Sequence, residues 1–131
     1  LVFGKYIGGQ FSDLAWGVGV DDLGNAYVAG ETMTAETSTP PFPITPNAFD
    51  GTFNGVVGID VDAFVAKIDP VGRNRVYVTF IGSDTPDVAY AIAVVPSGNA
   101  FVAGSTGGGS LLMPFPKSLT MGMSALFLVS L

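Results

Sequence analysis

The sequence predicts an all-β protein built from two copies of one structural unit. The stretch "LGNAYVAGETM" at 23–33 returns nearly unchanged as "SGNAFVAGSTG" at 97–107, 74 positions later. Apolar residues alternate between large and small along 14–20 and again along 88–94, which is the period of a β-strand. Only 12% of the residues are charged, while the chain contains 18 Gly and 9 Pro. This composition favours short strands joined by tight turns.

The internal repeat extends well beyond these two stretches. Residues 5–33 and 79–107 align without a gap, and 12 of the 29 pairs are identical. After a connection of different length, "PFP" at 41–43 matches "PFP" at 114–116, and "DAFVAKI" at 62–68 matches "SALFLVSL" at 124–131. The two copies therefore differ mainly in the length of their middle loop.

The first strand of each unit has one bulky face and one face of small residues. Strict alternation places Leu14, Trp16, Val18 and Val20 on the bulky face and Ala15, Gly17 and Gly19 on the small one. Because both faces are apolar, we expect both to be buried, with a neighbouring sheet close to the small face. The residues expected to pack blade on blade are Trp16, Val18, Tyr90 and Ile92.

Turns and further strands follow in the same order in each unit. "DDLGN" and "VPSGN" predict tight turns, since Gly and Asn tolerate positive φ. Second strands are predicted at 25–31 and 99–105, and third strands at 62–68 and 124–131. In the first unit "DPVGRN" predicts another turn before a fourth strand at 75–81. Four short antiparallel strands per unit, stacked face to face, are typical of a β-propeller blade.

The motifs "YIGG", "GVGVDDLGNAYVAGET", "FPITPNAF" and "DAFVAKIDPVG" occur in this order along the first unit. In this respect the chain resembles the bacterial β-propeller repeat family, often called the seven-bladed propeller-type repeat. The resemblance implies a propeller fold, no enzyme activity and a secreted or cell-surface location. The second unit departs from the pattern, because it has neither the closing turn nor the fourth strand.

The two ends of the chain are complementary, because "LVFGKYIGG" at 1–9 aligns with "RVYVTFIGS" at 75–83. We expect a donor strand at 1–9, a first blade at 10–83 with a long loop at 32–61, and an incomplete second blade at 84–131. Propellers typically have 4 to 8 blades, so the second blade is expected to be completed by the N-terminal strand of a neighbouring subunit. The donor residues are Leu1, Val2, Phe3, Lys5, Tyr6 and Ile7, and the acceptor residues are Ala125, Leu126, Phe127, Leu128, Val129 and Leu131.

Composition argues against several classes of function. The net charge is −6, and the five cations (Lys5, Lys67, Arg73, Arg75 and Lys117) form no basic run, so nucleic-acid binding is not expected. The sequence contains no Cys and no His, which removes thiolate chemistry and the commonest general base. No apolar run is long enough for a membrane-spanning helix. The start at Leu1 fits either a removed secretory leader or a fragment.

Individual polar and aromatic residues are candidates for binding or catalytic sites, but a structural role is favoured for each. Trp16 is the only Trp and is a candidate sugar platform, but core packing is favoured. Asp13 and Asp87 are expected to cap loops, and Asp50, Asp60 and Asp62 to hold turn backbone, with calcium as the alternative. Glu31 and Glu36 are a poor match for a hydrolase pair. "GSTGGGS" at 104–110 predicts a turn. The loop 32–61 is expected to pack Phe42, Phe49 and Phe53, or to bind a ligand or glycan.

The expected function is an extracellular structural or adhesive protein, not an enzyme, with no cofactor and no metal. It assembles head to tail with copies of itself into a filament, tube or ring. One alternative is a lectin-like carbohydrate-binding module, a closed propeller of three or four subunits. The other is a fragment of a larger propeller. Cell-surface or glycan ligands are the further partners considered.

Overall fold

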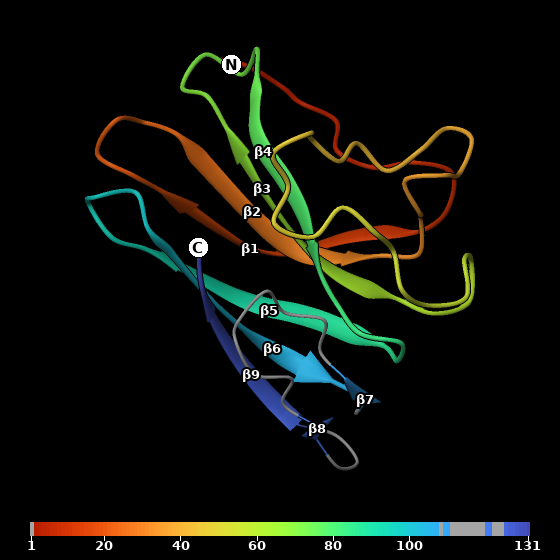
Figure 1. The fold of residues 1–131 in the computed structure, drawn as a ribbon. Coiled ribbons are helices and arrows are strands. Elements are labelled where there is room, and N and C mark those ends of the chain that lie inside the picture. Colours follow the sequence, from red (N-terminus) through yellow and green to blue (C-terminus); the bar gives the residue numbers. More distant parts are fainter. Residues whose placement is uncertain (1, 108, 111–119, 122–124) are drawn as a thin grey trace.

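The computed structural model describes residues 2–107, 109–110, 120–121 and 125–131, and this part of the chain is all β (Figure 1). The first four strands are β1 (Asp13–Val20), β2 (Ala26–Thr32), β3 (Asp62–Ile68) and β4 (Arg75–Ile81). They are followed by β5 (Asp87–Val94), β6 (Ala100–Thr106), β7 (Gly109–Ser110), β8 (Thr120–Met121) and β9 (Ala125–Ser130). Among the described residues, no helix is long and apolar enough to cross a bilayer.

The first sheet is an antiparallel meander in the order β1-β2-β3-β4. Its strands agree with the predicted ranges to within one residue at each end. The turns form where predicted, because Gly24, Gly72 and Gly98 have φ values of +83°, +73° and +88°, which side chains disfavour. The all-β, antiparallel prediction is therefore confirmed.

The second sheet has the order β5-β6-β9, and among the described residues no strand pairs with the outer edge of β9. Its register follows the repeat, since Gly30 pairs with Phe64 in the first sheet and Gly104 pairs with Phe127 in the second. The short β7–β8 pair forms a separate two-stranded sheet, which the sequence did not predict.

The strict alternation predicted along the first strand of each unit is wrong at one position. A β-bulge interrupts the register between Ala15 and Gly17, and another lies between Ala89 and Ala91. Trp16 and Tyr90 occupy the two bulges, at equivalent positions of the repeat. Because a bulge adds one residue, Leu14 shares a face with Gly17 and Gly19, while Ala15 shares a face with Val18.

The two sheets pack face to face, and we call this contact the junction. Its buried core consists of Ala29, Ala63, Val65, Ile81, Ala89 and Val102. The expected close approach over small residues is present: a Cβ on Gly17 would lie 3.1 Å from Ile92 Cγ2, and one on Gly19 would lie 2.6 Å from Val94 Cγ2. Side chains at these two glycines would therefore force the sheets apart.

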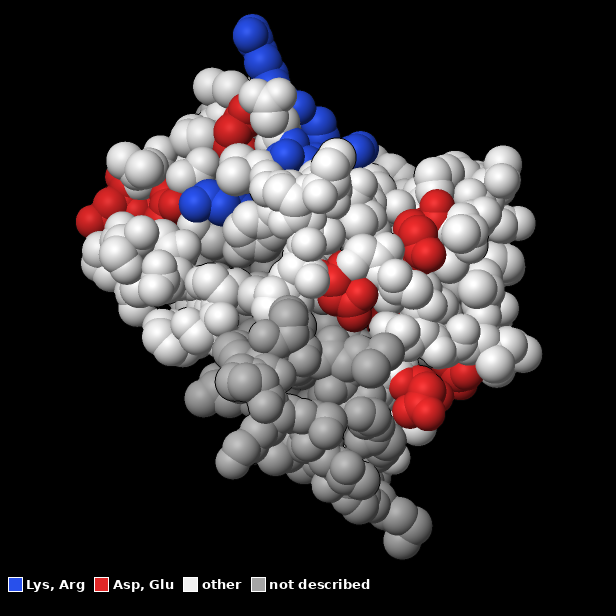
Figure 2. All heavy atoms as spheres, viewed as in Figure 1, with Lys and Arg blue, Asp and Glu red and all other residues white. Residues whose placement is uncertain are grey.

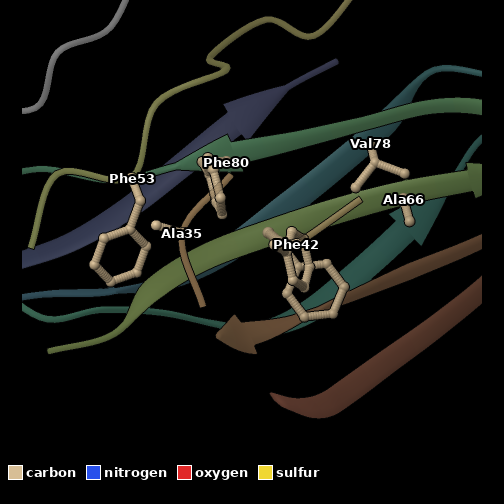
Figure 3. Packing of buried hydrophobic residues seen from close by; sticks show 7 residues of the cluster. Ala35, Phe42, Phe53, Ala66, Val78 and Phe80 are labelled. Atoms are coloured by element: carbon tan, nitrogen blue, oxygen red, sulfur yellow. The ribbon is translucent and has the colours of Figure 1, made fainter. Parts of the chain in front are cut away.

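The long loop covers part of the other face of the first sheet, which we call its outer face (Figure 3). Phe42 and Phe53 from the loop are buried against Phe64 and Phe80, with 5.4 Å between the ring centroids of Phe42 and Phe80. The prediction that the loop packs on its own sheet is confirmed for Phe42 and Phe53, and Phe49 is half-buried. Aromatic side chains supply much of the apolar area in this small core.

The expectation that both faces of β1 are buried is wrong for this chain. Val18 and Val20, on the outer face, are 71% and 60% exposed. The loop covers β3 and β4 but leaves these β1 residues open, because its Phe side chains reach only the far half of the sheet.

Candidate functional site

The open edge of β9 is the first candidate assembly surface. In the first sheet the equivalent strand, β3, pairs with β2 on one side and with β4 on the other. In the second sheet β9 pairs with β6 through the predicted acceptor residues from Ala125 to Val129, and Leu131 exchanges two backbone hydrogen bonds with Ala100. The opposite edge of β9 therefore presents peptide N–H and C=O groups without a strand partner in the described chain.

The N-terminal segment is the second candidate surface. Among the described residues, no backbone–backbone hydrogen bond involves residues 2–8. Val2 and Tyr6 are 91% and 73% exposed, whereas Phe3 lies against Gly72 and Ile7 packs beside the outer-face core. Lys5 Nζ donates to the Arg73 carbonyl oxygen at 3.0 Å. Leu1 lies outside the described residues. The peptide groups of this segment are thus available for a strand ladder.

Two uncovered apolar faces form the third candidate surface. One is the β1 part of the outer face of the first sheet, with Val18 and Val20. The other is the part of the outer face of the second sheet formed by β5 and β6, which carries exposed Ala91, Ala93 and Phe101. These side chains carry no charge, and exposed apolar faces of this kind mark interaction surfaces.

The bulge residues of the two sheets contact each other. The rings of Trp16 and Tyr90 lie 6.2 Å apart with an interplanar angle of 58°. They are 52% and 53% exposed, so the predicted packing partners do touch but are not buried as core residues would be. Ile92, in contrast, packs at the edge of the junction core.

The prediction that Asp13 and Asp87 cap loops is confirmed. Asp13 Oδ2 accepts a hydrogen bond from the Gly9 N–H at 2.9 Å, and Asp87 Oδ2 accepts one from the Ser83 N–H at 2.6 Å. Gly9 and Ser83 are equivalent in the repeat, so both carboxylates hold the chain just before the first strand of their sheets.

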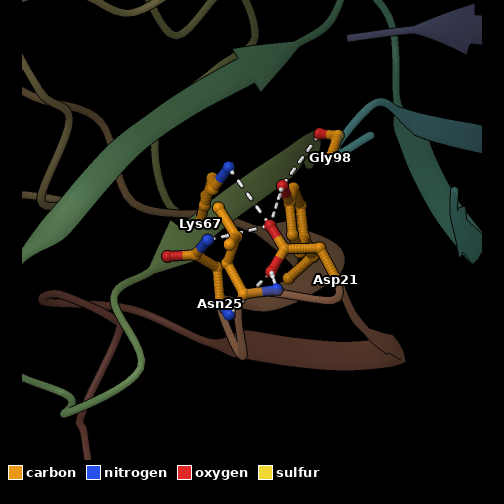
Figure 4. A network of polar contacts seen from close by, with 6 residues as sticks. Asp21, Asn25, Lys67 and Gly98 are labelled. Carbon is orange, nitrogen blue, oxygen red and sulfur yellow. Dashed lines mark hydrogen bonds and ion pairs between the residues drawn. The ribbon is translucent and has the colours of Figure 1, made fainter. Parts of the chain in front are cut away.

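A polar cluster around Asp21 stabilises the junction from one end (Figure 4). The hydroxyl of Tyr27 lies 3.0 Å from Asp21 Oδ2 and 2.8 Å from the carbonyl oxygen of Gly98, which belongs to the β5–β6 turn. Lys67 Nζ lies 3.5 Å from Asp21 Oδ2. Burial by itself would raise the pKa of Asp21, but hydrogen bonds from Asn25, Tyr27 and Leu23 hold it at about 2.

Sequence reasoning missed this cluster, although the repeat contains a signal for it. The positions equivalent to Asp21 and Tyr27 are Val95 and Phe101 in the second unit. The register of the third strands places Ser130 where the first sheet has Lys67. Three polar residues of the first repeat unit are absent together from the second unit, which indicates a polar contact that only the first unit makes.

A second set of carboxylates lies at the opposite end of the junction. Asp62 and Asp87 are fully buried, and Asp62 Oδ2 accepts a hydrogen bond from the Asn54 N–H at 2.9 Å, while its Oδ1 has no hydrogen-bond partner. Burial, together with the charges of Asp87, Asp50 and Asp60, raises the pKa of Asp62 to about 7. Burial also raises the pKa of Asp87.

The carboxylates considered for calcium instead hold turn backbone. Asp50 Oδ1 accepts from the Thr52 N–H and Asp60 Oδ2 accepts from the Val56 N–H. Within the described ranges, no group of three or more Asp, Glu, His or Cys side chains gathers into a metal site. Glu36 accepts a hydrogen bond from the Phe53 N–H, and Glu31 is half-buried on β2.

The cations are less scattered than the sequence indicated. Lys5, Arg73 and Arg75 line one open cleft at the N-terminal end of the molecule, where Figure 2 shows Lys and Arg together. All three are exposed, and Lys117 lies outside the described residues. The turn predicted at 104–110 is wrong for most of its described residues, because 104–106 end β6 and Gly109–Ser110 form β7.

Comparison with known proteins supports the architecture seen here. The family model for the beta-propeller repeat matches residues 2–33, which comprise the N-terminal segment, β1, the first turn and β2. No curated protein matches the chain. Residues 2–33 are therefore similar to the beta-propeller repeat, and the all-β fold with its repeated antiparallel sheets agrees with this match.

Proposed function

We propose that this protein is a non-enzymatic structural or adhesive module that assembles with copies of itself by strand addition. The N-terminal segment of one copy would pair with the open edge of β9 in the next. The carrying observation is that β9 has an open edge where its equivalent, β3, has β4 as a partner. The segment at 1–9 resembles 75–83, the residues that form β4 and its continuation.

The repeat specifies the register of this pairing. In the first sheet Tyr77 pairs with Lys67, and Phe80 pairs with Phe64. Replacing Tyr77 and Lys67 by their repeat equivalents places Phe3 opposite Ser130. Replacing Phe80 and Phe64 in the same way places Tyr6 opposite Phe127. The added strand would satisfy the peptide groups of β9 and of residues 2–8 at once.

Such a contact joins two different surfaces and is therefore head to tail. Head-to-tail contacts form a ring when the rotation between copies closes, and an open filament or tube when it does not. The proposal also includes a secreted or cell-surface location, for which the family resemblance is the support. Fractionation of the native host into cytoplasm, envelope and medium tests this location.

Cysteine capture tests the strand register, because the natural chain contains no Cys. One chain carries Phe3→Cys and a second carries Ser130→Cys, so every heterodimeric disulfide joins two molecules. We expect efficient cross-linking of the mixture under mild oxidation. Val2→Cys mixed with Ser130→Cys is the matched control, because successive strand residues point to opposite faces. Equal cross-linking by both mixtures would contradict the proposed pairing.

Deletion of residues 1–8 tests whether the segment is needed at all. We expect the shortened chain to give small soluble species or irregular aggregates, but no ordered assembly in electron micrographs. Val2→Pro is the milder variant, since it removes one backbone donor from the proposed ladder. Normal assemblies from the deleted chain would rule out strand addition.

A lectin-like ring is the second candidate, and the half-exposed Trp16–Tyr90 pair is the observation that favours it. Sugars stack on exposed aromatic rings of this kind. A glycan that binds this pair would change the fluorescence of Trp16, whereas a purely structural polymer would show no such change in a glycan screen.

A further inference from the structure

We propose that two molecules stack through their outer faces. The outer face of the first sheet of one molecule lies on the outer face of the second sheet of the other, so that Val18 and Val20 of one cover Ala91 and Ala93 of the other. This contact deepens the proposed self-assembly and rests on it for the identity of the partner. It would repeat between molecules the junction that the two sheets already make within one molecule.

The internal junction provides the template. Ile92 and Val94 of β5 project onto the bare backbone of Gly17 and Gly19 in β1, close enough that a Cβ on either glycine would meet them at 3.1 Å or less. At the internal junction, the second sheet therefore contributes the bulky residues and the first sheet contributes the small ones.

Both halves of the same contact are present again on the two outer faces. The repeat equivalents of Ile92 and Val94 are Val18 and Val20, which are mostly exposed. The equivalents of Gly17 and Gly19 are Ala91 and Ala93, which are also exposed. One face therefore carries the bulky row and the other face carries the small row, so the two are complementary between copies.

The sizes of these side chains nearly balance at the Val18 end of the contact but not at the Val20 end. Ala91 adds a methyl group relative to Gly17, but Val18 is one methylene smaller than Ile92. Ala93 adds a methyl group opposite Val20, which equals Val94. We expect an intermolecular junction that is wider at its Val20 end, because the added methyl group of Ala93 is not offset by a smaller partner there.

At three described positions, the outer face of the second sheet has uncharged residues where the internal junction has a polar cluster. The buried Asp21 and Tyr27 and the partly exposed Lys67 of the internal junction are replaced here by Val95, Phe101 and Ser130. Uncharged residues can be covered by an apolar face without leaving a buried charge unpaired.

Strand addition and sheet stacking are satisfied by one relative placement of two copies. Residues 1–7 precede β1 at the same spacing at which β4 precedes β5, since both pairs are offset by 74 positions. A donated N-terminal strand therefore brings the next β1 onto β5, just as β4 leads into β5 across the internal junction. Tyr90 of one copy would then meet Trp16 of the next, extending the Trp16–Tyr90 contact into a continuous row.

A two-variant mixing experiment tests the stacking. Val18→Asp blocks the bulky face and Ala91→Asp blocks the small face, and both positions are exposed, so the isolated chain should fold. We expect each variant alone to associate at least about tenfold more weakly than the natural chain, because a buried unpaired carboxylate is costly. Mixing the two should restore discrete pairs, since each molecule keeps the face that the other lacks.

The matched control is Ile59→Asp, which introduces the same charge at an exposed apolar residue in the long loop. It should associate like the natural chain. Failure of the mixture to form pairs, or unchanged association of both single variants, would overturn the stacking. Circular dichroism of each variant checks that its β-structure is retained.

Trp16 fluorescence provides an independent readout, because it is the only Trp. On association of the natural chain, we expect its emission to move to shorter wavelength as Tyr90 of the neighbour covers the ring. Unchanged emission in an assembled sample that cross-links through Phe3→Cys and Ser130→Cys would overturn stacking and leave strand addition standing. The opposite pattern, stacking without cross-linking, would overturn strand addition alone. A natural chain that stays monomeric at high concentration would overturn both.

Discussion

The internal junction and the outer face of the second sheet are built on equivalent strands but differ in how they are held. The junction has Gly17 and Gly19 under bulky residues and a polar cluster in which Tyr27 reaches the carbonyl oxygen of Gly98. The outer face has Ala91 and Ala93 in the same places and lacks the polar cluster. The two repeat units thus share the same strands, while the glycines and the polar cluster that hold the internal junction occur only in the first unit.

This difference explains how a chain with so few charges divides its polar residues. Asp21, Asp62, Asp87 and Tyr27 are buried, and two hydrogen bonds near them join the two units: the Tyr27 hydroxyl donates to the Gly98 carbonyl oxygen, and the Asp87 N–H donates to the Val61 carbonyl oxygen. The exposed outer-face residues Val18, Val20, Ala91, Ala93 and Phe101 are all uncharged and apolar. Directional contacts specify a permanent junction, whereas an apolar face suits a contact that forms after folding.

The largest effect is expected where the outer face of the first sheet is already covered. Phe42→Ala removes a buried ring that packs on Phe64 and Phe80, and should lower the free energy of unfolding by about 3–5 kcal/mol. Val18→Ala, on the uncovered part of the same face, should change it by less than about 0.5 kcal/mol. Urea denaturation of both variants measures the difference, and equal losses would mean that β1 is covered in the folded monomer.

The buried carboxylates should make the internal junction sensitive to pH. The pKa of Asp62 rises from 3.8 to about 7 on folding, so the folded chain keeps a proton that the unfolded chain releases. Stability should therefore fall as pH rises across this window, by up to about 1.4 kcal/mol per pH unit, and level off above it. In Asp62→Asn this decline should be reduced, as measured by denaturation along a pH series. An unchanged decline would assign the titration to another group.

Equivalent substitutions at the internal junction and on the outer face of the second sheet should differ in their effect on stability. Gly19→Val places a side chain into Val94 and should cost about 1–3 kcal/mol in the free energy of unfolding. Ala93→Val, at the equivalent exposed position, should leave monomer stability nearly unchanged. Thermal denaturation at low protein concentration compares the two, and similar losses would indicate that the outer face of the second sheet is not open.

The smallest effect concerns the polar cluster. Tyr27→Phe removes the hydroxyl that lies within hydrogen-bonding distance of Asp21 and Gly98, and should cost about 1 kcal/mol. Phe101→Tyr, the reciprocal change in the second copy, should gain nothing in the monomer, because Val95 offers no acceptor side chain there. A stabilising Phe101→Tyr would show that a partner for this hydroxyl exists on the outer face.

Much of the fold could be predicted because it depends on local pattern. Alternation along 14–20 and 88–94, the glycines at 24, 72 and 98, and the repeated motifs determined the strands, the turns and their order. The bulges at Trp16 and Tyr90 could not be predicted, since an extra residue in a ladder depends on how the partner strand pairs. The predicted burial of Val18 and Val20 does not hold within the single chain, where they are 71% and 60% exposed, because exposure depends on what covers a face.

The strands, the turns, the duplication and the likeness of residues 2–33 to the beta-propeller repeat could all be inferred from the amino-acid sequence, because period-2 patterning and turn residues act within short segments of chain. Three features emerged only from the packing of the sheets: which faces are covered, how the cluster of Asp21, Tyr27 and Lys67 meets the turn at Gly98, and the burial of Asp62 and Asp87 near one another. These contacts join residues far apart in sequence, and their energies depend on burial and distance, which exist only once the sheets have packed.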